Sequence, residues 1–142
     1  MPNPPVTVRL DPRRLEQLKA IAHAEGSSVA DVIAQIIRTK IADGVISPTI
    51  PGVTVKTVSD GVMIDLGEGK SATYSSVSAR EFATAIRAVA QGASSIVSLD
   101  HHYGVVRQGT GIKIIAPFPG PEVAFPPSLA EDLAGLIEDA AK

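Results

Sequence analysis

The sequence predicts two regions of different fold class joined by a short connector. Residues 1–44 are expected to form one strand and two helices, a β-α-α unit that pairs with a second copy of itself. Residues 45–52 contain two prolines and end on a glycine, a composition typical of an extended connector. Residues 53–142 alternate between strand patterns and amphipathic helices, which favours an α+β domain.

The composition indicates a globular protein and excludes several kinds of site. Of the 142 residues, 44% are hydrophobic and 20% are charged, and none is a cysteine, which excludes disulfides and a thiol nucleophile. No leader and no apolar run of ~18 residues is present, so we expect a cytoplasmic protein without membrane contact. The formal net charge of −2 gives no global sign of nucleic-acid binding. Such a role must therefore rest on local geometry.

The first expected element is a short strand over residues 6–10. Apolar side chains at positions 6, 8 and 10 alternate with Thr7 and Arg9, so the two kinds point to opposite faces of the strand. A lone strand in so short a region has no partner for its backbone hydrogen bonds. The strand pattern therefore favours pairing with the same segment of a second copy.

Two helices with clear end signals are expected next. Asp11 before Pro12 is typical of a helix N-terminus, and Gly26 of the residue that ends a helix. The second helix begins after Ser28, which is expected to form a capping box with Asp31. Its apolar residues recur at helical spacing: Val29, Val32, Ile33, Ile36, Ile37 and Ile41. Because a unit of about 44 residues cannot cover them all, we expect an intertwined homodimer, with a higher oligomer left open.

The order Val6-Thr-Val-Arg-Leu-Asp-Pro, a helix, and then Gly26-Ser-Ser-Val-Ala-Asp-Val-Ile resembles the ribbon-helix-helix family of the MetJ, Arc and CopG type. The resemblance covers residues 4–44. It implies a dimeric transcriptional regulator, usually a repressor, that places a two-stranded antiparallel ribbon in the major groove of double-stranded DNA. The rest of the chain carries no such resemblance.

The resemblance also implies which residues contact DNA. The outward strand positions hold Thr7 and Arg9, and Arg9 has the donors to bind guanine. A third outward position holds Pro5, which has no side-chain donor, so Asn3 is expected to contact bases instead. Phosphate contacts are expected from the start of the second helix and from nearby cations: Ser27, Ser28, Val29, Arg13, Arg14 and Lys19.

Residues 53–142 show a pattern that repeats at an offset of fifty residues. The offset superposes a turn residue and two helix-start residues: Gly61 on Gly111, Ser78 on Ser128, and Glu81 on Glu131. Each copy, residues 53–91 and 103–142, is expected to hold three strands and a helix that begins in a Ser-x-x-Glu capping box. We expect both helices on one face of a sheet, with a further strand within residues 95–100.

Metal binding and catalysis are not predicted. His101 and His102 are neighbours on a strand pattern and would point to opposite faces, and the chain has three histidines in all. Residues 67–71 lack the full spacing of a phosphate-binding loop, and no carboxylates are paired as in a hydrolase. We therefore expect a protein that is not an enzyme and needs no cofactor.

Two functions remain. The first is a DNA-binding regulator whose C-terminal domain senses an effector or forms oligomers. The second is a non-enzymatic interaction module, an antitoxin or a scaffold, in which the N-terminal segment only dimerises. A steep fall of DNA affinity with salt would distinguish the first from the second.

Overall fold

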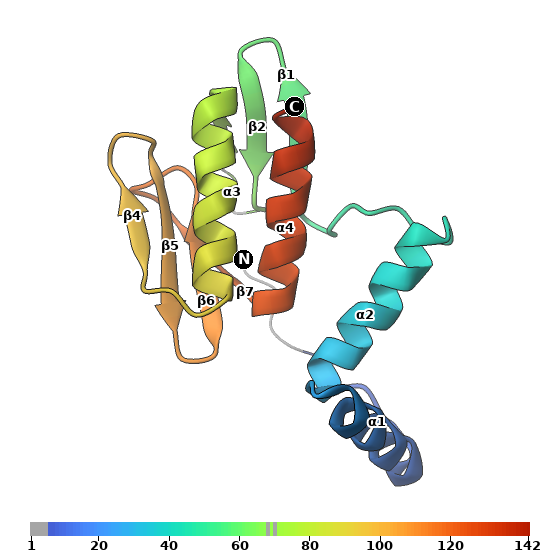
Figure 1. Ribbon diagram of the computed structural model, residues 1–142. Helices are drawn as coiled ribbons and strands as arrows, with labels where there is room; N and C mark the ends of the chain where they lie inside the picture. Colours follow the sequence, from blue (N-terminus) through green and yellow to red (C-terminus); the bar gives the residue numbers. More distant parts are fainter. Residues whose placement is uncertain (1–5, 68, 70) are drawn as a thin grey trace. The chain divides into compact units, whose positions relative to one another are not determined.

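The computed structural model describes residues 6–67, 69 and 71–142. The chain divides into two compact units, one ending at Pro48 and the other running from Thr49 to Lys142. The first unit contains helices α1 (Pro12–Glu25) and α2 (Val29–Ala42), and all the strands belong to the second (Figure 1). Each unit is therefore considered by itself.

Both ends of α1 and the start of α2 lie at the residues that the local signals predict. The Asp11 side chain caps α1 by accepting a hydrogen bond from the Arg13 amide at 2.8 Å. Gly26 ends the helix in the left-handed conformation, with φ at 66°. Ser28 and Asp31 form both bonds of the capping box at the start of α2, at 3.1 and 3.3 Å. These predictions are confirmed.

The predicted β-α-α fold of the N-terminal unit is wrong, because the unit is α-α. Residues 6–10 belong to no strand or helix, and all five are exposed. A strand is defined by hydrogen bonds to a second strand, and no segment among the described residues pairs with this one. The alternation of Val6, Val8 and Leu10 with polar residues therefore does not make a ribbon within this chain, and the ribbon-helix-helix fold is not found here.

The second unit contains two antiparallel sheets rather than the single sheet that was predicted. The first sheet has three strands in chain order: β1 (Thr54–Val58), β2 (Gly61–Asp65) and β3 (Ser71–Tyr74). The second sheet has four strands, also in chain order: β4 (Ile96–Ser98), β5 (Tyr103–Gln108), β6 (Gly111–Ile115) and β7 (Glu122–Phe125). Each sheet is followed by a helix, so the chain makes two successive sheet-and-helix units.

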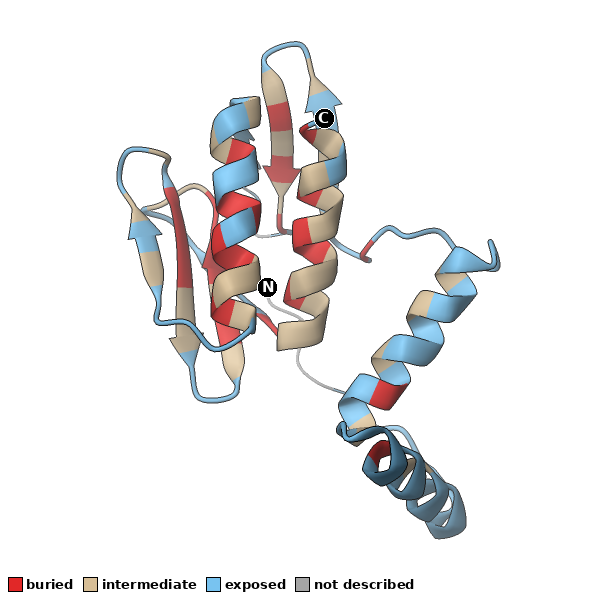
Figure 2. Ribbon diagram, in the orientation of Figure 1, coloured by how far each residue is buried: buried red, intermediate tan, exposed pale blue. Residues whose placement is uncertain are grey.

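Helices α3 (Ser76–Ala90) and α4 (Pro127–Ala140) lie side by side (Figure 1). Each helix packs on strands of both sheets, α3 on β2, β3 and β5, and α4 on β1, β2 and β6. The largest fully buried side chains include Phe82 and Ile86 of α3 and Leu133 and Ile137 of α4. The buried residues follow the inward faces of the two helices (Figure 2). One hydrophobic core thus joins the two sheets.

Both predicted capping boxes in this unit are wrong, because each helix begins earlier. Ser75 caps α3 by accepting from the Ser78 amide at 3.1 Å. Helix α4 begins at Pro127, whose fixed φ suits the first helical position, and it has no side-chain cap. The side chains of Ser78 and Glu81 are therefore not used at the helix end and are available for other contacts.

Strand β4 distinguishes the second sheet from the first. At the offset of fifty residues, its counterpart is residues 46–48, which end on a proline and form no strand. The first sheet consequently stops at β1, whereas the second extends by one strand beyond β5. This additional strand and the first residue of β5 line a pocket beside α3, described below.

Candidate functional site

The residues predicted to contact DNA bases lie in the exposed segment before α1. Thr7 and Arg9 are both exposed, and neither side chain makes a hydrogen bond or ion pair to the other described residues. Asn3 lies outside the described residues. The segment therefore presents one free guanidinium next to the first helix.

The three cations predicted on α1 have different surroundings. Arg13 donates to the Asp11 carboxylate from Nε at 2.9 Å and from Nη2 at 2.7 Å. These bonds lower the pKa of Asp11 and raise that of Arg13. Arg14 donates to the neutral Gln17 amide oxygen at 2.9 Å, and Lys19 Nζ lies 3.6 Å from a Glu16 carboxylate oxygen. A phosphate would thus compete with a carboxylate for Arg13 but not for Arg14.

The backbone amides predicted to bind phosphate at the start of α2 are largely occupied. The Ser27 amide donates to the Ala22 carbonyl at 2.9 Å, and the Ser28 amide donates to the Asp31 carboxylate. Of the three predicted amides, only that of Val29 has no acceptor among the described residues. Because Asp31 also places a negative charge at the helix N-terminus, the capping box works against a bound phosphate here.

An extended apolar surface is the main feature of the N-terminal unit. Among its described residues only Ala22 and Val32 are buried hydrophobics. Ile33, Ile36 and Ile37 on α2 are 44–50% exposed. The other exposed large hydrophobics of the unit lie before α1, on α1 and after α2: Val6, Val8, Leu10, Leu15, Ile21, Val45 and Ile46. Two helices of this length leave most of their apolar face in water.

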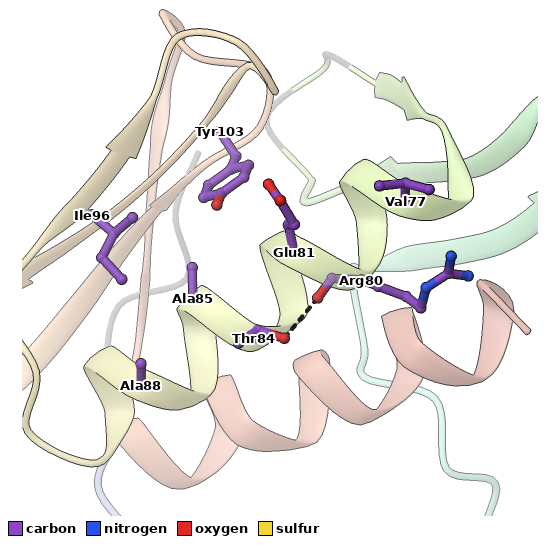
Figure 3. A pocket seen from close by; sticks show the side chains of 8 residues that line it. All are labelled: Val77, Arg80, Glu81, Thr84, Ala85, Ala88, Ile96 and Tyr103. Carbon is purple, nitrogen blue, oxygen red and sulfur yellow. Dashed lines mark hydrogen bonds between the residues drawn. The ribbon is translucent and has the colours of Figure 1, made fainter.

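The C-terminal unit has a pocket of about 490 Å³ between α3 and the strands β4 and β5 (Figure 3). Its α3 wall includes the small side chains of Ala85 and Ala88, and Ile96 and Tyr103 line the opposite side. Glu81 stands at the same wall as the alanines, one turn earlier in the helix. The pocket therefore combines apolar walls with a carboxylate at one end.

His101 connects the loop after β4 to the start of α3. Its Nε2 lies 2.9 Å from a Glu81 carboxylate oxygen, and its Nδ1 lies 2.7 Å from the Ser78 hydroxyl. With the proton of a neutral ring on Nε2, Glu81 accepts from the ring and Nδ1 accepts from Ser78. The same loop is bound by the Tyr74 hydroxyl, which donates to the His102 carbonyl at 2.8 Å. These bonds fix the loop between β4 and β5, the two strands whose residues line the pocket.

Tyr103 places a further polar group in the pocket lining. Its ring stacks on Phe82, with centroids 4.8 Å apart and an interplanar angle of 13°. The residue is only 5% exposed, and its hydroxyl has no hydrogen-bond partner among the described residues. Burial, and secondly the charge of Glu81, raise the pKa of Tyr103 above its ordinary value. The phenol is thus a neutral group able to donate and accept.

Sequence reasoning missed this pocket entirely. The sequence pattern places Ser78 and Glu81 in a helix cap and His101 on a strand, and it indicates no contact between them. Ser75, three residues before Ser78, was the signal that could have revealed this. It can cap the helix in place of Ser78, and the side chains of Ser78 and Glu81 are then free for other contacts.

No further group or relative indicates a function. No three histidine, aspartate or glutamate side chains gather as metal ligands within residues 6–67, 69 and 71–142. None of the helices in the described part of the chain is long and apolar enough to cross a membrane. Comparison of the chain with protein families, with curated proteins and with solved structures finds no match.

Proposed function

We propose that the protein is a DNA-binding regulator that acts as a homodimer paired through its N-terminal unit. The observation that carries the proposal is the apolar surface of α1 and α2, which lies beside an exposed, cation-bearing segment. Pairing of two copies would bury the apolar surface, and the cation-bearing segment would contact DNA.

A second copy is the partner that best suits the apolar surface. Full burial of a fully exposed isoleucine side chain contributes about 1.5–3 kcal/mol, and burial of one that is half exposed contributes about half of that. Ile33, Ile36 and Ile37 follow each other at helical spacing, so one partner surface can cover all three. In a symmetric dimer the same patch of each copy forms the interface, so each isoleucine contributes to the buried surface twice. Such an interface also supplies the core that the small unit lacks.

The charges near the first helix favour DNA as the ligand of the paired unit. Residues 6–19 carry four cations, Arg9, Arg13, Arg14 and Lys19, against the two acids Asp11 and Glu16, a local net charge of 4 − 2 = +2. A dimer doubles this charge, whereas the whole chain is at −2. Arg9 and Arg14 have no carboxylate partner among the described residues, so both guanidinium groups are available for phosphates or base edges.

Binding to a random pool of DNA duplexes, followed by titration of the selected sequence, tests the proposal. We expect the full-length protein to select a site with two related half-sites, because a symmetric dimer presents its contacts twice. Arg9→Ala should weaken specific binding by about 1–3 kcal/mol. Lys40→Ala, which removes an exposed cation from the end of α2, is the matched control and should have a much smaller effect. Selection of no sequence at low salt would refute the proposal.

The interaction module remains the second candidate, and one observation favours it. Arg13 is paired with Asp11, and the capping box occupies the start of α2, so part of the predicted phosphate-binding surface is already used. A module of this kind would dimerise without DNA. Salt separates the two functions, since phosphate neutralisation makes DNA affinity fall log-linearly as salt rises.

A further inference from the structure

We propose that the pocket between α3 and the strands β4 and β5 binds a small organic ammonium ion with an apolar body. This inference concerns the C-terminal unit alone and does not depend on DNA binding. It rests on the size of the pocket, on its apolar walls, and on two polar groups at one end.

The walls of the pocket suit a compact apolar group. A volume of about 490 Å³ falls within the range of about 300–1,000 Å³ that is usual for small-molecule sites. The space exists because α3 presents alanines at positions 85 and 88 instead of large side chains. Ile96 of β4 and the ring of Tyr103 face them. An aromatic or short aliphatic body would contact carbon atoms on both sides.

The polar groups specify a cation rather than an anion. The Glu81 side chain is 51% exposed, and one of its carboxylate oxygens is 2.9 Å from His101 Nε2. The Tyr103 hydroxyl has no partner, although the residue is almost fully buried. An ammonium group has donors for the carboxylate and for the phenol oxygen together, and a bond to the carboxylate is charge-assisted. A ligand would therefore give the Tyr103 hydroxyl the hydrogen bond that none of the described residues provides.

The cation in the pocket lining does not neutralise Glu81. Arg80 extends away from Tyr103 and Glu81 (Figure 3). Its Nη1 donates to the Ala141 carbonyl at 3.0 Å, beyond the C-terminal end of α4. The charge of the Glu81 carboxylate consequently determines which sign of ligand is attracted to this end.

The related position on α4 shows that a carboxylate alone does not make the site. Glu131, fifty residues after Glu81, accepts a hydrogen bond from the Gln91 side chain at 3.1 Å and does not line the pocket. No counterpart of β4 stands beside it, because residues 46–48 form no strand. Glu131 therefore provides a matched control for Glu81.

Three probes that share a benzyl group and are similar in size but differ in charge test the proposal on the full-length protein. They are 2-phenylethylamine, 2-phenylethanol and phenylacetate, each titrated while backbone amide resonances are followed by NMR. We expect the amine to bind about tenfold more tightly than the alcohol, because a charge-assisted bond replaces a neutral one. The anion should bind more weakly than both. The shifted resonances should cluster on residues 81–88 and around Tyr103.

Substitutions then assign the preference to named groups. Glu81→Gln should abolish the preference for the amine over the alcohol, and Tyr103→Phe should weaken amine binding several-fold, whereas Glu131→Gln should change neither. Ala88→Leu leaves Glu81 and His101 intact and fills the pocket, so it should remove binding of all probes even if Glu81→Gln fails to fold. Equal affinity for the three probes, or unchanged amine binding in Ala88→Leu, would overturn the proposal.

Discussion

Arg87 of α3 and Glu138 of α4 form the main polar contact between the two central helices. Arg87 donates from Nη2 to one carboxylate oxygen at 2.6 Å and from Nε to both oxygens at 3.2 Å. The hydrogen bond to Glu138, opposed by partial burial, raises the pKa of Arg87. The pair is 51 residues apart in sequence and fixes the register of α3 against α4 above the shared core.

The contribution of this pair to stability should be small but measurable. The two side chains are 37% and 38% exposed, so solvent screens their attraction. We expect a coupling energy of about 0.5–1 kcal/mol from a double-mutant cycle with Arg87→Met and Glu138→Gln, measured by urea unfolding. The cycle of Lys142 and Asp139, an exposed pair on the terminal turn, serves as control and should give less. Additive single mutants at the first pair would contradict the expectation.

The cap of α1 should weaken in acid. Arg13 lowers the pKa of Asp11 in the folded protein below its ordinary value of about 3.9. This contact therefore contributes its full stability at a pH above the pKa of Asp11 in the unfolded protein. The contribution is lost as the pH falls through the pKa of Asp11 in the folded protein. A carboxyl NMR titration should show the lowered pKa, and it should return toward the ordinary value in Arg13→Ala. An unchanged titration in that variant would exclude Arg13 as the cause.

Two glycines at equivalent places in the repeat should respond differently to alanine. A Cβ on Gly61 would collide with the Tyr74 carbonyl, and the residue has φ of 141°. A Cβ on Gly111 would meet its nearest neighbour, the Gln108 carbonyl, at an ordinary 3.7 Å. We expect Gly61→Ala to cost about 2–4 kcal/mol and Gly111→Ala less than about 1 kcal/mol in the free energy of unfolding. Equal losses would show that the turn relaxes.

The proposed pairing of the N-terminal units depends on the isoleucines of α2. Placing a carboxylate at the centre of that surface with Ile36→Asp should shift sedimentation equilibrium from dimer to monomer, because a buried unpaired charge is costly. Leu99→Asp alters a more exposed apolar residue of the C-terminal unit and should leave the dimer intact. A wild-type protein that is monomeric over the whole concentration range would contradict the pairing.

Local signals in the sequence were sufficient for both ends of α1 and for the start of α2. Asp11, Ser28 and Asp31 satisfy backbone amides within three residues of themselves, and Gly26 ends its helix through its own backbone conformation. Such contacts need no distant partner, so a few consecutive residues determine where the helix begins or ends. The same holds for the two-residue turn before Gly61, which joins β1 to β2.

Features that depend on a distant partner were decided only by the tertiary structure. The alternation at residues 6–10 predicted a strand, but a strand needs a second one, and this chain supplies none beside it. Ser75 and Ser78 could each have capped α3, and the choice of Ser75 released Ser78 for a bond to His101, 23 residues away. The pocket required that bond, the additional strand β4 and the packing of Tyr103 on Phe82 at once. Hydrogen bonds between neighbours in sequence can be predicted from the sequence itself. Contacts between distant segments cannot, because they depend on which segments the tertiary packing brings together.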